Sequence, residues 1–137
     1  MDRYLDGARS GPTHLRQPGV AAIVVESIQT GARLRHYELG PWVVMLNHVH
    51  LLIRPQIDAS RLLQSLKGGS ARRASQLLGL TGQRFWQEES YDHVVHDEKT
   101  FRRIANYIED NPVRAGLCET PAEFAWSSAA VSAGADD

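Results

Sequence analysis

The sequence of 137 residues lacks several features that mark particular classes of protein. Its single cysteine, Cys118, excludes an internal disulfide and fits a reducing compartment. No apolar stretch approaches the length of a membrane span. The first residues also lack the pattern of a signal peptide, in which a basic segment precedes an apolar one. We therefore expect one cytoplasmic domain that does not enter the membrane.

The segment 43–54, Val-Val-Met-Leu-Asn-His-Val-His-Leu-Leu-Ile-Arg, is typical of a β-strand that two histidines interrupt. Side chains alternate between the faces of a strand, so His48 and His50 lie on one face and Val49 lies on the other. Two adjacent imidazoles can bind one divalent metal ion, because imidazole is the commonest metal ligand in proteins. The same tripeptide also occurs as two hydrogen-bonded histidines on a half-exposed face, and it does not by itself separate these interpretations.

The other elements follow from apolar periodicity and from residues that favour helix ends. We expect helices over 18–31, 58–78, 97–112 and 122–128, and strands over 34–46, 48–54 and 91–95. Asp58 and Asp97 are suitable N-caps, and Pro112 is expected to end its helix. We expect residues 1–17 to be irregular, residues 18–130 to form the domain, and residues 131–137 to be a flexible tail.

The net charge of −1 gives no overall attraction to nucleic acid, so a polyanion would have to bind a local patch. Such a patch is present between residues 61 and 84, which hold five basic residues and no acidic one: Arg61, Lys67, Arg72, Arg73 and Arg84. These cations can contact a DNA backbone. They can equally form the solvated face of an ordinary helix. Gly68 and Gly69 cost about 2 kcal/mol against two alanines, and they predict a kink or the close approach of a backbone or ligand.

Tyr107 and Asn111 are four residues apart in the helix expected over 97–112, so they lie on one side of it. At about 100° per residue, both flank the apolar stripe of Phe101, Ile104 and Ile108. A phenol at that rim can reach a cleft, and an amide oxygen beside it can complete a metal site. Each residue also has an ordinary interpretation, Tyr107 as an amphipathic rim residue and Asn111 as a helix C-terminal residue.

Four segments in this order carry a resemblance to a known family. They are 42–50 (Trp-Val-Val-Met-Leu-Asn-His-Val-His), 66–68 (Leu-Lys-Gly), 85–87 (Phe-Trp-Gln) and 107–117 (Tyr-Ile-Glu-Asp-Asn-Pro-Val-Arg-Ala-Gly-Leu). Together they resemble the REP-associated tyrosine transposases, which belong to the single-tyrosine HUH transposases. The resemblance covers about residues 42–128, and the segments are far more specific jointly than singly.

The resemblance implies an α+β fold of the ferredoxin-like type, with an antiparallel sheet and helices packed on one face. It implies that His48 and His50 ligate Mg²⁺ or Mn²⁺, that Asn111 is the third ligand, and that Tyr107 is the nucleophile. Tyr91 is a competing tyrosine outside the matching segments. The cations expected to hold a single-stranded or hairpin DNA are Arg61, Lys67, Arg72, Arg73 and Arg114.

These residue types suit the cleavage of single-stranded DNA. The metal ion would neutralise charge that grows on the scissile phosphate. The Tyr107 oxygen would attack the phosphorus to give a 5′-phosphotyrosine and a free 3′-hydroxyl. The covalent bond keeps the energy of the broken phosphodiester, so rejoining to another end needs no ATP.

Two features depart from the family. Relatives begin with a strand in the middle of the sheet, and nothing before Pro18 has a strand pattern, so we expect the first strand to be missing or rebuilt. Leu46 stands where proline is usual. An alternative function is therefore a hairpin DNA-binding protein of the same fold that does not cut. A hydrolytic metalloenzyme would need a general base that the sequence does not reveal. Both a monomer and a homodimer remain open.

Overall fold

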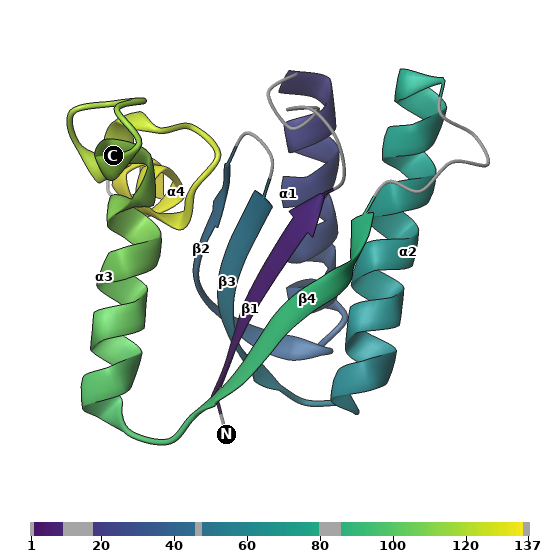
Figure 1. The fold of residues 1–137 in the computed structure, drawn as a ribbon, viewed down its shortest axis with the longest axis horizontal. Helices are drawn as coiled ribbons and strands as arrows, with labels where there is room; N and C mark the ends of the chain where they lie inside the picture. Colours follow the sequence, from purple (N-terminus) through teal and green to yellow (C-terminus); the bar gives the residue numbers. More distant parts are fainter. Residues whose placement is uncertain (1, 10–17, 46–47, 80–85, 136–137) are drawn as a thin grey trace.

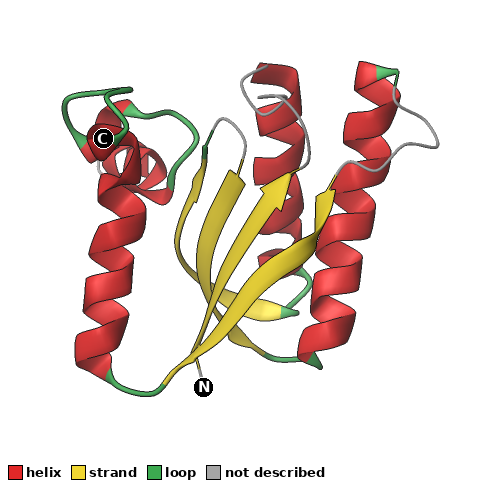
Figure 2. Cartoon of the chain, viewed as in Figure 1, coloured by secondary structure: helices red, strands yellow, loops and turns green. Residues whose placement is uncertain are grey.

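The computed structural model describes residues 2–9, 18–45, 48–79 and 86–135, and the side chains of 2, 6–9, 86–94 and 132–135 are outside that description. Four strands and four α-helices follow one another along the chain (Figures 1 and 2). In order they are β1 Asp2–Arg9, α1 Pro18–Arg33, β2 Tyr37–Val44, β3 His48–Pro55, α2 Ala59–Leu78, β4 Trp86–Val95, α3 Glu98–Arg114 and α4 Ser128–Ala135.

The strands form one sheet in the order β2-β3-β1-β4, and all neighbours are antiparallel. Helix α1 connects β1 to β2 across β3, and helix α2 connects β3 to β4 across β1. This is the ferredoxin-like arrangement, so the predicted α+β fold class is confirmed. The histidine strand β3 is central, because it pairs with β2 on one side and with β1 on the other.

The first strand is present, which corrects the expectation that it was missing; the expectation that residues 1–17 were irregular is wrong for residues 2–9, and residues 10–17 lie outside the described residues. Strand β1 pairs with both β3 and β4, and its partners in β3 run from Arg3 opposite Ile53 to Ala8 opposite His48. The sequence Asp-Arg-Tyr-Leu-Asp-Gly-Ala-Arg is poor in residues that favour strands. Pairing on both edges stabilises β1, and a local pattern cannot reveal such long-range contacts.

Helices cover both faces of the sheet, whereas the sequence predicted them on one. Helices α1 and α2 pack against one face, and α3 lies against the other (Figure 1). The alternation along β3 divides its side chains accordingly. Val49, Leu51 and Ile53 belong to the core beneath α1 and α2, and Leu52 belongs to the core beneath α3, together with Ile108.

Both predicted N-caps are confirmed. Asp58 accepts hydrogen bonds from the amides of Ser60 and Arg61 at 3.0 and 3.2 Å, and Asp97 accepts one from the amide of Thr100 at 2.7 Å. Each carboxylate satisfies helix amides that have no partner inside the helix. Helix α2 runs through Gly68 and Gly69, where an added Cβ would meet no atom of the described chain within 4 Å, so the glycines do not serve internal packing there.

Pro112 does not end α3, contrary to the sequence prediction, because the helix continues to Arg114. Proline removes one donor from the helix, but the ring of Pro112 is fully buried, so packing offsets this loss. Two residues after the helix ends, Gly116 has a φ of 77°. The amide of Gly116 donates to Val113 at 3.0 Å, and that of Leu117 donates to Pro112 at 2.9 Å. This glycine-dependent ending fixes the geometry of the last turn.

The C-terminal segment also differs from the prediction. Instead of a helix over 122–128, a single 3₁₀ turn spans Pro121–Glu123, and α4 begins at Ser128 and includes residues predicted as a tail. The hydroxyl of Ser128 donates to the carbonyl oxygen of Trp42 at 3.2 Å and accepts from its amide at 2.9 Å. These two bonds tie the start of α4 to the edge strand β2.

Candidate functional site

His48 and His50 lie on the same face of β3, as the strand alternation predicted. Their rings are 4.7 Å apart between centroids and nearly perpendicular, at 82°. His50 is only 4% exposed, whereas His48 is half-buried. The pair faces α3, because Leu52 two residues later on the same face packs against the core beneath that helix.

His50 is held by a residue from the unpredicted strand. The hydroxyl of Tyr4 lies 2.6 Å from Nδ1 of His50, and the two rings stack at 5.8 Å with an angle of 22°. Burial lowers the pKa of His50 to about 4, with smaller effects from the charges of His48 and Arg114. The ring is therefore neutral near pH 7, which is the form that binds metal ions.

Tyr107 of α3 lies beside the histidines in the same chain. Its ring centroid is 5.8 Å from that of His50, and the two rings are almost perpendicular, at 87°. The Tyr107 side chain is 45% exposed although Ile108, the next residue, is completely buried. The buried stripe of α3 thus docks the helix while Tyr107 stays at its rim, within reach of a ligand from solvent.

Arg114 fixes Tyr107 from the end of the same helix. Its guanidinium carbon lies 4.1 Å from the centre of the Tyr107 ring, and one of its nitrogens donates to the Tyr107 carbonyl oxygen at 2.9 Å. A guanidinium over a phenol is favourable electrostatically. The structure thus places this residue, which was predicted as a general DNA contact, directly beside Tyr107.

Asn111 follows Tyr107 by one helical turn and is partly buried. Its proposed role as a metal ligand stays a prediction. In the parts of the chain with a described structure, no three side chains of His, Cys, Asp or Glu form a group that could hold a metal ion. An amide oxygen remains a suitable third donor beside two imidazoles.

The four predicted DNA contacts on α2 do not share the histidine face. Helix α2 packs beside α1 on the opposite side of the sheet (Figure 1). Arg61 and Arg72 are exposed, and Arg73 pairs with Glu26 of α1 at 2.9 Å. Lys67 is partly buried, and this burial lowers its pKa. A DNA that touched both these cations and Tyr107 would have to pass around an edge of the sheet.

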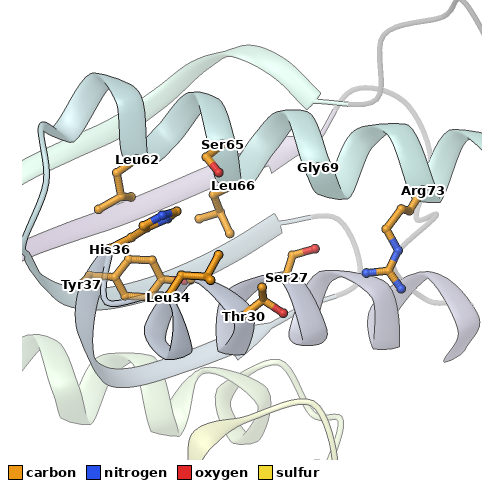
Figure 3. A pocket seen from close by; sticks show the side chains of 11 residues that line it. Ser27, Thr30, Leu34, His36, Tyr37, Leu62, Ser65, Leu66, Gly69 and Arg73 are labelled. Atoms are coloured by element: carbon orange, nitrogen blue, oxygen red, sulfur yellow. The ribbon is translucent and has the colours of Figure 1, made fainter.

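A hollow lies between α1 and α2 (Figure 3). It has a volume of about 210 Å³, and Ser27, Thr30, Ser65 and Arg73 supply polar groups to its lining. Tyr37 closes it from β2, and its hydroxyl donates to the Ile28 carbonyl oxygen. This hollow lies on the opposite sheet face from His48 and His50, so it is separate from the candidate site.

The donors around the histidine pair fit a divalent metal ion. A metal–imidazole bond is about 2.1 Å long, so two histidines that share an ion must lie a few ångströms apart, as these do. Nδ1 of His50 is occupied by Tyr4, and the other ring nitrogen, Nε2, is buried beside His48. Neutral nitrogens leave the positive charge of the ion uncompensated, and phosphate oxygens can then enter its coordination shell.

Some predicted residues lie outside the description. Tyr91, the competing tyrosine, is on β4 opposite Asp6, but its side chain is not described, and the same holds for Trp86. Leu46 and Phe85 are outside the described residues altogether. None of the described helices is both long and apolar enough to cross a membrane. Sequence reasoning missed Tyr4, because only the pairing of β1 brings it to His50.

Comparison with known proteins identifies the family. A family model described as "Transposase IS200 like" matches residues 14–111. A REP-associated tyrosine transposase of Escherichia coli (strain K12) is 26% identical over 99 residues, which are 70% of this chain and 56% of that protein. A protein of Haemophilus influenzae described as uncharacterized is 26% identical over 102 residues, covering 55% of this chain and 54% of the relative. The chain thus spans just over half the length of these curated relatives.

Two solved structures share the fold. The structure of a REP-associated tyrosine transposase bound to a REP hairpin matches with a TM-score of 0.75 and 20% identity, over 93% of this chain and 75% of that one. The crystal structure of a candidate transposase from Deinococcus radiodurans matches with a TM-score of 0.58 and 26% identity, over 80% and 89%. Because the family model covers more than half of the sequence, the chain belongs to the IS200-like transposase family and is similar to the REP-associated tyrosine transposases.

Proposed function

We propose that this protein is a metal-dependent transposase that cleaves and rejoins single-stranded or hairpin DNA through a 5′-phosphotyrosine at Tyr107. The observation that supports it best is the approach of three rings. Tyr107 lies 5.8 Å from His50, and His50 lies 4.7 Å from His48, although the residues come from a helix and a strand far apart in sequence.

The chemistry follows from the residues in the site. The Tyr107 oxygen forms a bond to the phosphorus as the bond from phosphorus to the 3′-oxygen breaks. The tyrosine proton is lost to solvent, and the leaving 3′-oxygen takes up a proton. Rejoining reverses this exchange when another 3′-hydroxyl displaces the tyrosine. Arg114, stacked on Tyr107, keeps the phenol oriented and supplies positive charge beside the attacked phosphate.

The proposed cofactor is Mg²⁺ or Mn²⁺, held by His48, His50 and Asn111. Such an ion would neutralise charge that develops on the phosphate oxygens. Burial keeps His50 neutral at physiological pH, so no proton has to leave before the nitrogen binds. His50 is thus suited to hold the metal firmly, and His48 is the more accessible of the two histidines.

A DNA hairpin with a single-stranded flank is the proposed substrate, in line with the hairpin bound to the structural neighbour. Lys67 of α2 is one of the cations proposed to contact its backbone. Arg73 pairs with Glu26 of α1, and Lys67, six residues earlier, lies about 120° from Arg73 around the helix.

The alternative of a hairpin-binding protein that does not cut rested on a missing first strand and on Leu46 in place of proline, and Leu46 lies outside the described residues. Strand β1 is present and carries Tyr4 to the histidine pair, so the first of these reasons is removed. The cutting enzyme is therefore the function that the geometry supports better.

The decisive experiment incubates the protein with a labelled DNA hairpin that has a single-stranded flank, in Mn²⁺ or Mg²⁺. We expect a covalent protein–DNA adduct, detected as a shifted band that survives denaturation. Tyr107→Phe should abolish the adduct and retain binding, whereas Tyr91→Phe, a matched loss of one hydroxyl, should form it normally. Tight binding with no adduct in either metal would refute the cleavage proposal.

A further inference from the structure

Strand β1 places one polar side chain against the buried histidine. Tyr4 is opposite Leu52 in the register, so it shares a sheet face with Leu52 and with His50, two residues earlier on β3. Its hydroxyl lies 2.6 Å from Nδ1 of His50, and the stacked rings leave little freedom of rotation. The contact joins residues 46 positions apart in the sequence.

We propose that Tyr4 is a positioning residue for the metal site: its hydroxyl accepts a hydrogen bond from the Nδ1–H of His50 and so keeps Nε2 unprotonated for the ion. This inference rests on the proposed role of His50 as a metal ligand. An imidazole carries one proton when neutral, so a proton held on Nδ1 leaves the lone pair on Nε2. Partners of this kind set the tautomer and the orientation of metal-binding histidines.

The surroundings of Tyr4 suit this role. It packs against the core beneath α3 that contains Val95 and Ile108, on a strand that pairs along both edges. The phenol therefore has a fixed position from which to orient the imidazole. The opposite polarity, in which the tyrosine hydroxyl donates to Nδ1, would put the proton on Nε2 and block metal binding there. The two cases predict different tautomers of His50 in the metal-free protein.

The first test determines the tautomer of His50 directly. Nitrogen NMR of the whole chain labelled in its histidines distinguishes protonated from unprotonated ring nitrogens, and the His50 signals are assigned by their loss in His50→Gln. We expect the Nδ1–H form in the wild type and a mixture of tautomers in Tyr4→Phe. Phe retains the ring and its stacking, so a purely structural role of Tyr4 would leave the tautomer unchanged.

The second test measures Mn²⁺ affinity in the absence of DNA. Loss of a partner of this kind typically costs 10–100-fold in metal affinity, and we expect Tyr4→Phe to fall in that range. Tyr37→Phe is the matched control, because the Tyr37 hydroxyl is also hydrogen-bonded, but its partner is Ile28 on the other face. That variant should keep both the His50 tautomer and the wild-type Mn²⁺ affinity.

The outcomes separate this inference from the proposed function. An Nε2–H tautomer in the wild type, or an unchanged tautomer and affinity in Tyr4→Phe, would overturn the role of Tyr4. Failure of the wild type to bind Mn²⁺ would also overturn it, since Tyr4 would then position no ligand. If Tyr4→Phe weakens Mn²⁺ binding but the wild type forms no adduct with DNA, the positioning role stands and the cleavage proposal fails.

Discussion

The two faces of the sheet differ in the kinds of side chain that lie between the sheet and its helices. The face beneath α1 and α2 is filled by aliphatic and aromatic side chains, including Val24, Ile28, Trp42 and Leu51. The face beneath α3 has a smaller apolar core, and next to it lie Tyr4, His48, His50 and Tyr107. The same strands thus serve stability on one side and place polar rings together on the other.

The difference shows where the sequence departs from what stability alone would favour. His50 is only 4% exposed in a central strand, at a position where an aliphatic side chain would pack without the cost of burying a polar ring. Its burial disfavours the charged form and is the main cause of its lowered pKa. Such a local conflict in an otherwise consistent fold marks a functional site. The contrast between the faces is therefore open to direct tests.

The largest effect is expected from truncating matched isoleucines on the two faces. Ile108 in α3 and Ile28 in α1 are both fully buried, and replacement of either by alanine should cost about 2–5 kcal/mol of unfolding free energy. Urea unfolding measures this loss. Ile108→Ala should also slow adduct formation, because Ile108 docks the turn that carries Tyr107. Ile28→Ala should form the adduct at the wild-type rate at temperatures where it stays folded, and equal slowing in both variants would contradict a division between the faces.

The second prediction concerns pH. The pKa of His50 is about 4 in the folded protein and about 6.5 in the unfolded chain, so acid protonates the unfolded state first. Stability should therefore fall as the pH drops from about 6.5 to about 4, by up to about 3 kcal/mol from this residue. Urea unfolding at several pH values should show a shallower dependence in His50→Gln than in the wild type. Parallel curves for the two proteins would show that burial of His50 does not carry this cost.

The third prediction concerns Arg114, which belongs to the polar face. Arg114→Ala removes the guanidinium over Tyr107 and its bond to the Tyr107 carbonyl, and adduct formation should slow by about 10²-fold. Arg114→Lys retains the charge but not the planar stacking, so an intermediate rate is expected. The control is Arg102→Ala, because Arg102 is an exposed α3 residue that pairs with Glu98. An Arg114→Ala rate equal to that of the control would exclude a role at the reacting phosphate.

The features that the sequence predicted are those with local signals. Asp58 and Asp97 cap their helices as expected, and strand alternation placed His48 and His50 together. Strand β1 was missed because its stability comes from two neighbouring strands and not from the propensities of its own residues. Tyr4 was missed for the same reason. Pro112 was misjudged because burial of its ring, which outweighs a lost hydrogen bond, depends on tertiary packing.

The smallest effect is expected at Gly68 and Gly69, on the helix that faces away from the histidines. An added Cβ would meet no described atom within 4 Å at either glycine, so alanine should stabilise the protein by about 1 kcal/mol at each position. Thermal unfolding measures this gain. If a DNA backbone approaches α2 here, the same variants should bind the hairpin more weakly, as Lys67→Ala should through the loss of a phosphate contact.

Salt dependence separates the two causes of weaker binding. Lys67→Ala should reduce the slope of log affinity against log salt by about 1, because one contact with a phosphate is lost. Gly68→Ala retains every charge of the helix, so it should lower the affinity at each salt concentration with the slope almost unchanged. Alanine variants that are more stable and bind the hairpin normally would show that DNA does not approach this part of α2. The DNA would then bind only on the face of the sheet that carries the histidines.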